Sequence, residues 1–310
     1  MKKIILILFL IASVPDALSW PIPEQTLKSL IANSSYIVIG YVTKVEYTKH
    51  PVTSITLTRA KIKILKTFKG HSITKDIYVY FDSGMICPEP DNYEKHTKVL
   101  CFLEANRDTT VGGFFAPGLS YASKKITSDD AEKCYEKRIN EFSKIVALND
   151  RSNQDYEIAE WLVKCAENTL TRYDGTADLL KSFDYAKNRE LTDYRKSLSK
   201  SQKERLFNCF ISLDELTVQD YGLVALIDGI DDVKLLVHLK KLAHTVKAPD
   251  WLAGNPYIHW IATYSKKDYS EISKKLTENL GSRKYNTPEN KKQMEQVYTD
   301  FLKLISENKE

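Results

Sequence analysis

The spacing of apolar residues changes near residue 127, and this change limits the folds open to the chain. Before it, β-branched and aromatic residues alternate with polar ones, a period typical of strands. After it, apolar residues recur every three and four positions, as on one face of a helix. A chain of 310 residues is also longer than a single core normally supports. The sequence therefore predicts an α+β protein with two domains, at residues 20–127 and 128–310.

The strand half begins with residues 36–47, in which both faces are apolar up to Val42 and one face then turns polar. Gly40 lies within this segment and predicts a bend or a bulge. In residues 54–70 the apolar positions change from odd to even numbers, which predicts a second bulge near Arg59. Further strands are expected at 76–81, 98–105, 111–118 and 119–123. Five or so bent strands of this kind favour a small closed barrel over a flat sheet.

Four motifs follow one another in this half: "SLIANSSYIVIGYVTKVE", "AKIKILKTFKG", "ICP" and "KVLCFLEA". In this order they resemble a tissue-inhibitor-of-metalloproteinases-like domain of the secreted bacterial kind, which is related to netrin-like modules. The resemblance covers roughly residues 24–145. It implies a five-stranded barrel of the OB type.

The same resemblance does not extend to the inhibitory group. In the inhibitors, an amino-terminal cysteine chelates the zinc of the target protease through its free amine and carbonyl. Here the expected mature chain begins "WPIPEQ" and has no cysteine before Cys87, and Ser123 stands where related modules often carry another cysteine. The resemblance therefore implies the barrel, without protease inhibition by this mechanism.

The second half is predicted to be helical throughout. Its first helix begins after Ser128, a suitable N-cap that is followed by acidic residues. Further helices are expected near 156–168, 175–187, 200–213, 218–228, 232–246, 267–280 and 288–307. Successive helix pairs are compatible with an irregular α-solenoid, but the sequence has no fixed repeat period, so a helical bundle fits it equally well.

Five cysteines are spread along the chain, too few for a disulfide framework in a chain of this length. Cys134 and Cys165 lie on the apolar stripes of consecutive predicted helices, at similar heights. They are either joined by a disulfide or packed as two small core residues. Cys209, on a later apolar stripe, is a rival partner for Cys165.

The sequence contains no motif of a known catalytic or cofactor site. It has no G-x-S-x-G, no H-E-x-x-H and no glycine pattern for a nucleotide, and His238 and His244 are six positions apart. We therefore predict no catalytic, cofactor-binding or metal-ligating residue. The formal charge of +4, with 45 basic and 41 acidic residues, does not favour nucleic acid as a partner.

An aromatic segment, residues 248–260, is the strongest candidate for recognition. It contains Trp251, Tyr257 and Trp260 between prolines and glycines. The three rings form either an exposed recognition patch or a packed corner between helices.

The composition and motifs favour an exported, non-enzymatic binding or interaction protein, with a protein or a glycan as its ligand. The alternative is a secreted hydrolase with its site in the helical half or in a cleft between the domains. A third possibility is a structural component of the cell envelope. The sequence specifies neither the partner nor the oligomeric state.

The amino terminus predicts export. Lys2 and Lys3 precede a short apolar run that ends at Val14, and small residues follow at Ala17 and Ser19. This is the layout of a secretory signal peptide, and the run is too short to span a bilayer of about 30 Å as a helix. We expect cleavage after Ser19, a mature protein in the periplasm or outside the cell, and no transmembrane anchor.

Amino-terminal sequencing of the exported protein tests this interpretation. We expect the mature chain to begin at Trp20. A mature chain that retains Met1 would contradict both the signal peptide and the predicted compartment.

Overall fold

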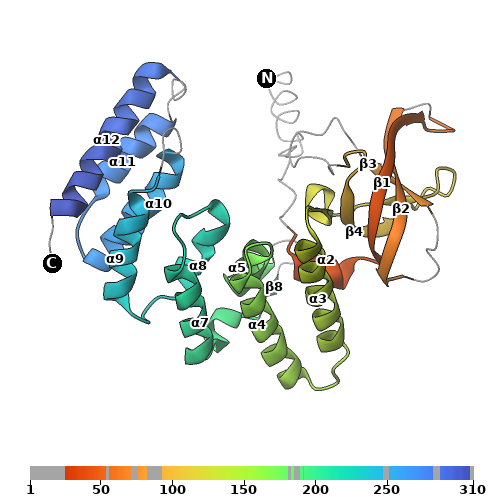
Figure 1. The fold of residues 1–310 in the computed structure, drawn as a ribbon, viewed down its shortest axis with the longest axis horizontal. Helices are drawn as coiled ribbons and strands as arrows, with labels where there is room; N and C mark the ends of the chain where they lie inside the picture. Colours follow the sequence, from red (N-terminus) through yellow and green to blue (C-terminus); the bar gives the residue numbers. More distant parts are fainter. Residues whose placement is uncertain are drawn as a thin grey trace, which may run out of the picture. The chain divides into compact units, whose positions relative to one another are not determined.

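The structure is a computed structural model, which describes residues 25–53, 56–70, 76–81, 93–180, 183–184, 189–190, 192–246, 251–281 and 287–307 (Figure 1). The protein is α+β, with a six-stranded sheet in its amino-terminal half and helices after it. It divides into two compact units, Met1–Ile139 and Asn140–Glu310, so the division falls later than residue 127. The predicted signal segment, Trp20 and Cys87 lie outside the described residues.

The first unit is built on six strands and two short helical segments. The strands are β1 Tyr36–Lys49, β2 Thr56–Lys69, β3 Asp76–Phe81, β4 Lys98–Ala105, β5 Phe114–Phe115 and β6 Ser123–Ile126. The helical segments are α2 Leu27–Asn33 and the 3₁₀ turn η1 Leu119–Ala122. The strand order is β1-β2-β3-β5-β4-β6, with a parallel β3–β5 pair and antiparallel pairs elsewhere. Because β1 also pairs with β4, the pairings return to the strand where they began.

The first half of β1 is buried on both faces, as its sequence predicts, and helix α3 (Asp129–Val146) explains the second face. Glu132 and Glu136, one turn apart on α3, bond to Lys98 of β4, at 2.8 Å, and to Lys66 of β2. Since β1 lies between β2 and β4, these two bonds place α3 across it. The ring of strands covers one face of β1, and α3 covers the other.

The bulges in the β1–β2 pair agree only in part with the sequence prediction. The register shifts between Ile39 and Gly40, which confirms the irregularity at the glycine. A Cβ atom at Gly40 would lie 2.3 Å from Ile62 Cγ2, so only glycine allows this approach. The bulge expected near Arg59 was wrong, because the register is continuous there. Thr58 is buried and extends the inward face that the even-numbered residues form. Because threonine is polar, the spacing of apolar residues did not reveal that this position faces inward.

The second unit is helical, with one small exception. Its helices are α4 Arg151–Glu167, α5 Arg172–Leu180, α6 Tyr194–Ser197, α7 Lys200–Ile211, η2 Val218–Asp220, α8 Tyr221–Leu226, α9 Asp232–Ala243, α10 Trp251–Ser265, α11 Ser270–Gly281 and α12 Pro288–Glu307. The carboxyl half of α3 also belongs to this unit. Within the described ranges, all these helices are too short or too polar to span a membrane.

One local prediction for this half was wrong, and one helix was not among those expected. The helix expected at 175–187 begins earlier, at Arg172, and ends at Leu180, and a two-stranded ribbon follows it (β7 Phe183–Asp184 and β8 Arg189–Glu190). Residues 251–265 form a continuous helix, although Pro256 lies inside it. Pro256 is the sixth residue of this helix and removes one main-chain hydrogen bond. The buried side chains of Tyr257, Ile258 and Ile261 supply the packing that stabilises the helix.

The helices form successive pairs, and the first helices of these pairs run parallel to one another. Glu160 and Glu167 of α4 contact Gln202 and Cys209 of α7 respectively, so residue numbers rise together along both helices. Helix α9 repeats this relation with α7, where Lys234 lies over the Phe207 ring and His238 against Phe210. Helices α4, α7 and α9 therefore run in one direction.

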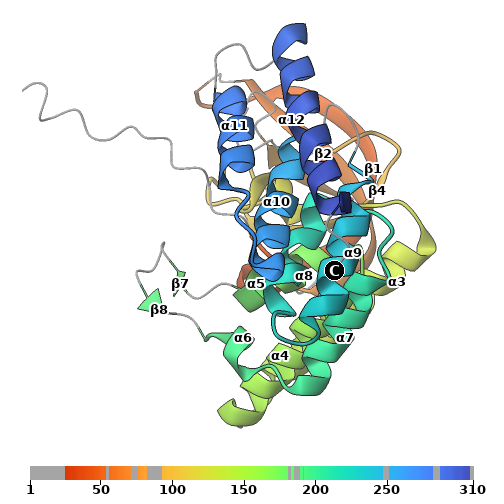
Figure 2. The same cartoon turned by 90° about the vertical axis from the view of Figure 1, so that its left-hand side faces the viewer.

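The second helices of the pairs, α5, α8 and α10, also lie next to one another in chain order. Arg172 at the start of α5 bonds to Asp220 at the start of α8. Tyr221 of α8 then contacts Trp260 of α10, and Asp228, just after α8, accepts a bond from Tyr264. Figure 1 and Figure 2 both show α11 and α12 side by side beyond α10.

Helices α4 and α5 approach very closely at Gly175. A Cβ atom there would lie 2.4 Å from the Ala166 backbone nitrogen and 2.5 Å from the Leu162 carbonyl oxygen. Both are main-chain atoms of α4, so they cannot yield as the end of a side chain can. Any side chain at this position would push the helices apart.

Gly175→Ala should therefore destabilise the protein, although alanine normally favours a helix. We expect a loss of about 1–3 kcal/mol, the usual cost of overpacking, in the free energy of unfolding measured with denaturant. Asn208→Ala, at an exposed position of α7, is the control and should change stability by less than about 0.5 kcal/mol. A Gly175→Ala variant as stable as the wild type would contradict the close approach of α4 and α5.

Candidate functional site

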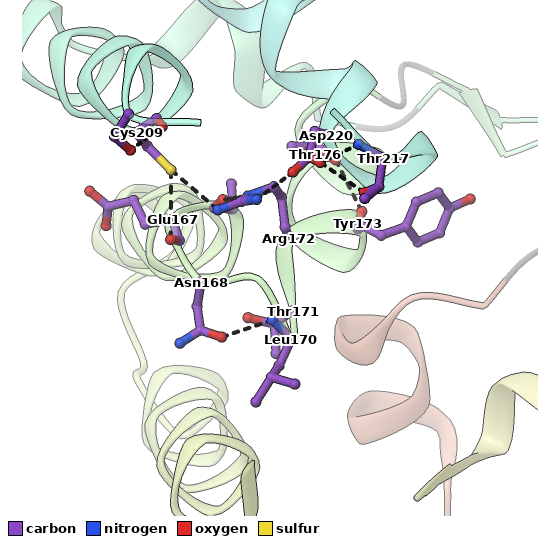
Figure 3. Close-up of polar contacts among 12 residues, drawn as sticks. Glu167, Asn168, Leu170, Thr171, Arg172, Tyr173, Thr176, Cys209, Thr217 and Asp220 are labelled. Carbon is purple, nitrogen blue, oxygen red and sulfur yellow. Dashed lines mark hydrogen bonds and ion pairs between the residues drawn. The ribbon is translucent and has the colours of Figure 1, made fainter. Parts of the chain in front are cut away.

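Helix α5 buries polar residues where a core helix would normally bury apolar ones. Its sequence is "RYDGTADLL", and its charged and hydroxyl side chains are almost fully covered: Arg172, Asp174, Thr176 and Asp178 are each at most 5% exposed. Charged residues are rarely buried to this extent unless they are paired. The candidate site is therefore the set of polar contacts around Arg172, which Figure 3 shows.

The guanidinium of Arg172 is held by three different helices. Nε donates to the carbonyl oxygen of Ala166, at the end of α4, over 3.1 Å. Nη1 bonds to Oδ1 of Asp220, before α8, and both side chains of this ion pair are only 5% exposed. Nη2 lies 3.5 Å from the Cys209 sulfur on α7. The Nε bond thus joins α5 to α4 within one helix pair, and the Nη1 and Nη2 bonds connect this pair with the next.

Asp220 is fixed just as firmly. Its second oxygen, Oδ2, accepts hydrogen bonds from the Thr217 backbone nitrogen at 2.7 Å and from Thr217 Oγ1 at 2.8 Å. The carboxylate therefore closes a capping box at the turn before α8 while it pairs with Arg172. The buried charges are satisfied on both sides, which burial in a low-dielectric interior requires.

A second arginine, Arg205, connects α7 with α4, the other two helices of these pairs. Arg205 of α7 bonds to Glu160 at 2.8 Å and to Glu167 at 2.8 and 2.6 Å, both on α4. Burial raises the pKa of Glu160, but bonds from Gln202 and Arg205 outweigh it and leave this pKa below its usual value. The Arg205 bonds raise the pKa of its guanidinium, most strongly the bond to Glu167. We call the contacts of Arg172 and Arg205 together the arginine ties.

The chemistry available at the arginine ties is structural rather than catalytic. Burial raises the pKa of the Cys209 thiol, so this sulfur stays protonated and is a weak nucleophile. Its proton is directed to the Glu167 carbonyl oxygen at 3.7 Å. The ties hold the surfaces of successive helix pairs in a fixed relation.

A second polar cluster lies in the first unit, near the turn between β1 and β2. His50 Nε2 is 2.8 Å from Asp108 Oδ2, and its Nδ1 accepts from the backbone nitrogens of Val52 and Thr53. Bonds from Thr110 and from His50 lower the pKa of Asp108 to about 2. Both ring nitrogens are engaged, so the pair closes a turn and has no nitrogen left to act as a base.

The described surface also contains a hollow of about 500 Å³ along α10 and α11. Its polar lining includes Asp268 and Ser270, which cap α11, and the exposed pair Lys274 and Glu278. Across the described ranges, His, Cys, Asp and Glu side chains form no group of three suited to a metal ion.

Cys134 and Cys165, which the sequence singled out, belong to different units. Cys165 is fully buried in the second unit, whereas Cys134 is partly exposed in the first. The structure has thiols at both positions and at Cys101 and Cys209. A bond between Cys134 and Cys165 therefore stays a prediction.

The structure describes the side chains of two of the three aromatic residues, Tyr257 and Trp260. Tyr257 is 1% exposed and contacts Trp260 edge-to-face at 5.8 Å, so Tyr257 belongs to the core. Trp260 is half-buried and also packs on Tyr221, at 5.3 Å. The side chain of Trp251 lies outside the described set. Tyr257 is therefore packed in the core within a helix, and a recognition patch in this segment stays a prediction.

Sequence reasoning missed the arginine ties altogether. Arg172 and Asp220 are 48 residues apart, and neither belongs to a motif. The only available signal was an excess of polar residues on the buried face of "TRYDGTADLL". The chain matches no protein-family model, and the search of curated proteins found no match either.

Removing one member of the buried ion pair should leave an uncompensated charge in the interior. We expect Asp220→Asn to cost about 3–5 kcal/mol of unfolding free energy. Arg172→Met combined with Asp220→Asn should cost less than the two single changes added together, because neither charge is then left alone.

Denaturant unfolding of the two single variants and the double variant measures this coupling. Lys200→Ala breaks an exposed pair with Glu204 and serves as the control, with a change near experimental error. Strictly additive effects would contradict the interaction between Arg172 and Asp220.

Proposed function

We propose that the protein is an exported, non-enzymatic binding protein whose helical unit is an irregular α-solenoid that presents a surface to a protein partner. The observation that carries this proposal is the parallel succession of α4, α7 and α9, with α5, α8 and α10 beside them. Stacked helix pairs of this kind produce extended surfaces, which repeat proteins use for binding. The arginine ties support the proposal because they keep two successive pairs in register.

We propose for the first unit an OB-type barrel of the inhibitor-like or netrin-like kind. The support is the order in which the strands pair, from β1 through β2, β3, β5 and β4 back to β1, with the short parallel β3–β5 contact. The amino-terminal segment supports export to the periplasm or the exterior. The proposed role of the barrel is that of a second interaction module.

A contact surface can be named on α9. Val233 and Val237 lie one turn apart and are 76% and 64% exposed. Aliphatic side chains pack well against apolar residues of another protein, whereas they offer a sugar neither an aromatic face nor a hydrogen bond. We therefore assign this face, defined by Val233 and Val237, to a protein partner rather than to a glycan.

Charge placed on this face should weaken binding. We expect Val233→Asp combined with Val237→Asp to weaken binding at least tenfold, about 1.4 kcal/mol, because the two carboxylates would be desolvated in the interface. The measurement is capture by the immobilised mature chain from the envelope and extracellular fraction, followed by a titration with the purified partner.

Val52→Asp, at an equally exposed valine of the first unit, is the matched control and should bind like the wild type. Circular dichroism confirms that both variants are folded. Saturable binding lost only in the α9 variant supports the proposal. Equal binding by both variants, capture of glycan alone, or turnover of a hydrolase substrate by the mature chain would overturn it.

A further inference from the structure

Three contacts, one turn apart, connect α7 with α9. Lys234 lies over the Phe207 ring at 5.5 Å, and His238 lies against the Phe210 ring at 5.4 Å. Beyond the end of α7, Lys241 pairs with Asp214 at 3.2 Å on the exposed side. The helices meet here through the ends of large side chains, and His238 is the middle contact.

The ring of His238 is buried and only partly satisfied. The residue is 8% exposed and meets Phe210 edge-to-face, with an interplanar angle of 79°. The backbone of Phe210 and Leu213, at the end of α7, lies close to the ring and raises its pKa. Nε2 is buried without a hydrogen-bond partner among the described residues. A neutral ring suits this position, because an unprotonated Nε2 needs no acceptor.

The charged groups that act on the ring come from both elements. Burial lowers the pKa of His238 most strongly, and Lys241 on its own helix lowers it further. The backbone of Phe210 and Leu213 and the Asp214 carboxylate oppose this without reversing it. A proton on Nε2 would add a charge and a donor beside an aromatic ring. Only separation of α9 from α7 would give that donor a water molecule to bond.

We propose that His238 is a proton-controlled latch between α7 and α9, closed while the imidazole is neutral and opened when Nε2 takes a proton. The direction of the pH dependence follows from the linkage between proton binding and stability. Because the unfolded or opened chain binds this proton more readily, the stabilisation is complete above the ordinary histidine pKa of 6.5 and decreases as the pH falls below it. An acidic medium would thus loosen the helix stack at one contact.

Hydrogen–deuterium exchange of the mature chain at about pH 7.5 and about pH 5.5 tests the latch, after correction for the intrinsic exchange rate at each pH. We expect a several-fold increase in amide opening at the end of α7 and along α9 at the lower pH. His238→Gln, which cannot be protonated, should lose this increase. His259→Gln, at an exposed histidine of α10, is the matched control and should keep it.

The titration of the ring by NMR in the wild-type chain is a second measurement, and it does not depend on a variant that folds. His238 should titrate below the ordinary histidine pKa of 6.5. Protection of α7 and α9 that does not change with pH, the same increase in His238→Gln, or titration of His238 at or above 6.5 would overturn the proposal. None of these results bears on partner binding through Val233 and Val237.

Discussion

The buried ion pair between Arg172 and Asp220 is the interaction on which the order of the helical unit depends most. Moving two charges out of water costs several kcal/mol each, so such a pair persists only with good geometry and full hydrogen bonding. Further bonds support the pair, because Ala166 and Cys209 accept from Arg172, and Thr217 donates to Asp220. Four helices must be in place at once for these bonds to form. The pair therefore selects one arrangement of α4, α5, α7 and α8 among the many that apolar packing alone would allow.

The first unit depends on a different constraint, the double burial of β1. Its central residues face the ring of strands on one side and α3 on the other, so β1 must have neighbours on both edges and both faces. Lys66 and Lys98 extend from the flanking strands to the carboxylates of α3. These bonds direct α3 across the sheet, and Gly40 allows β2 to approach β1 beneath it. The pairing of β1 with both β2 and β4 thus connects the two ends of the strand order.

The proposed latch and the arginine ties show how differently two contacts within one stack are built. At the ties, each nitrogen of the Arg172 guanidinium donates at least one hydrogen bond. Between α7 and α9 the central group is a histidine with one unpartnered nitrogen. The stack is then firm between its first two pairs and adjustable at the next contact. This asymmetry is a property of residue chemistry, since both contacts join parallel helices.

The sequence by itself determined the class of the fold and most of its elements. Period-two and period-three-to-four patterns identified β1, β4, α7 and α12 to within a few residues, because a buried face repeats along each element. The bulge wrongly placed near Arg59 and the unexpected α10 show the limit of this reasoning, since Thr58 is buried although polar and Pro256 lies within a helix. Only the tertiary structure decided which helices lie together. Contacts between successive pairs join residues 42 and 48 apart at one step and 27 and 36 apart at the next, so no repeat period exists to be read. Arg172 and Asp220 meet because the chain folds back between them, and the energy of a buried pair depends on that meeting in space rather than on any local pattern.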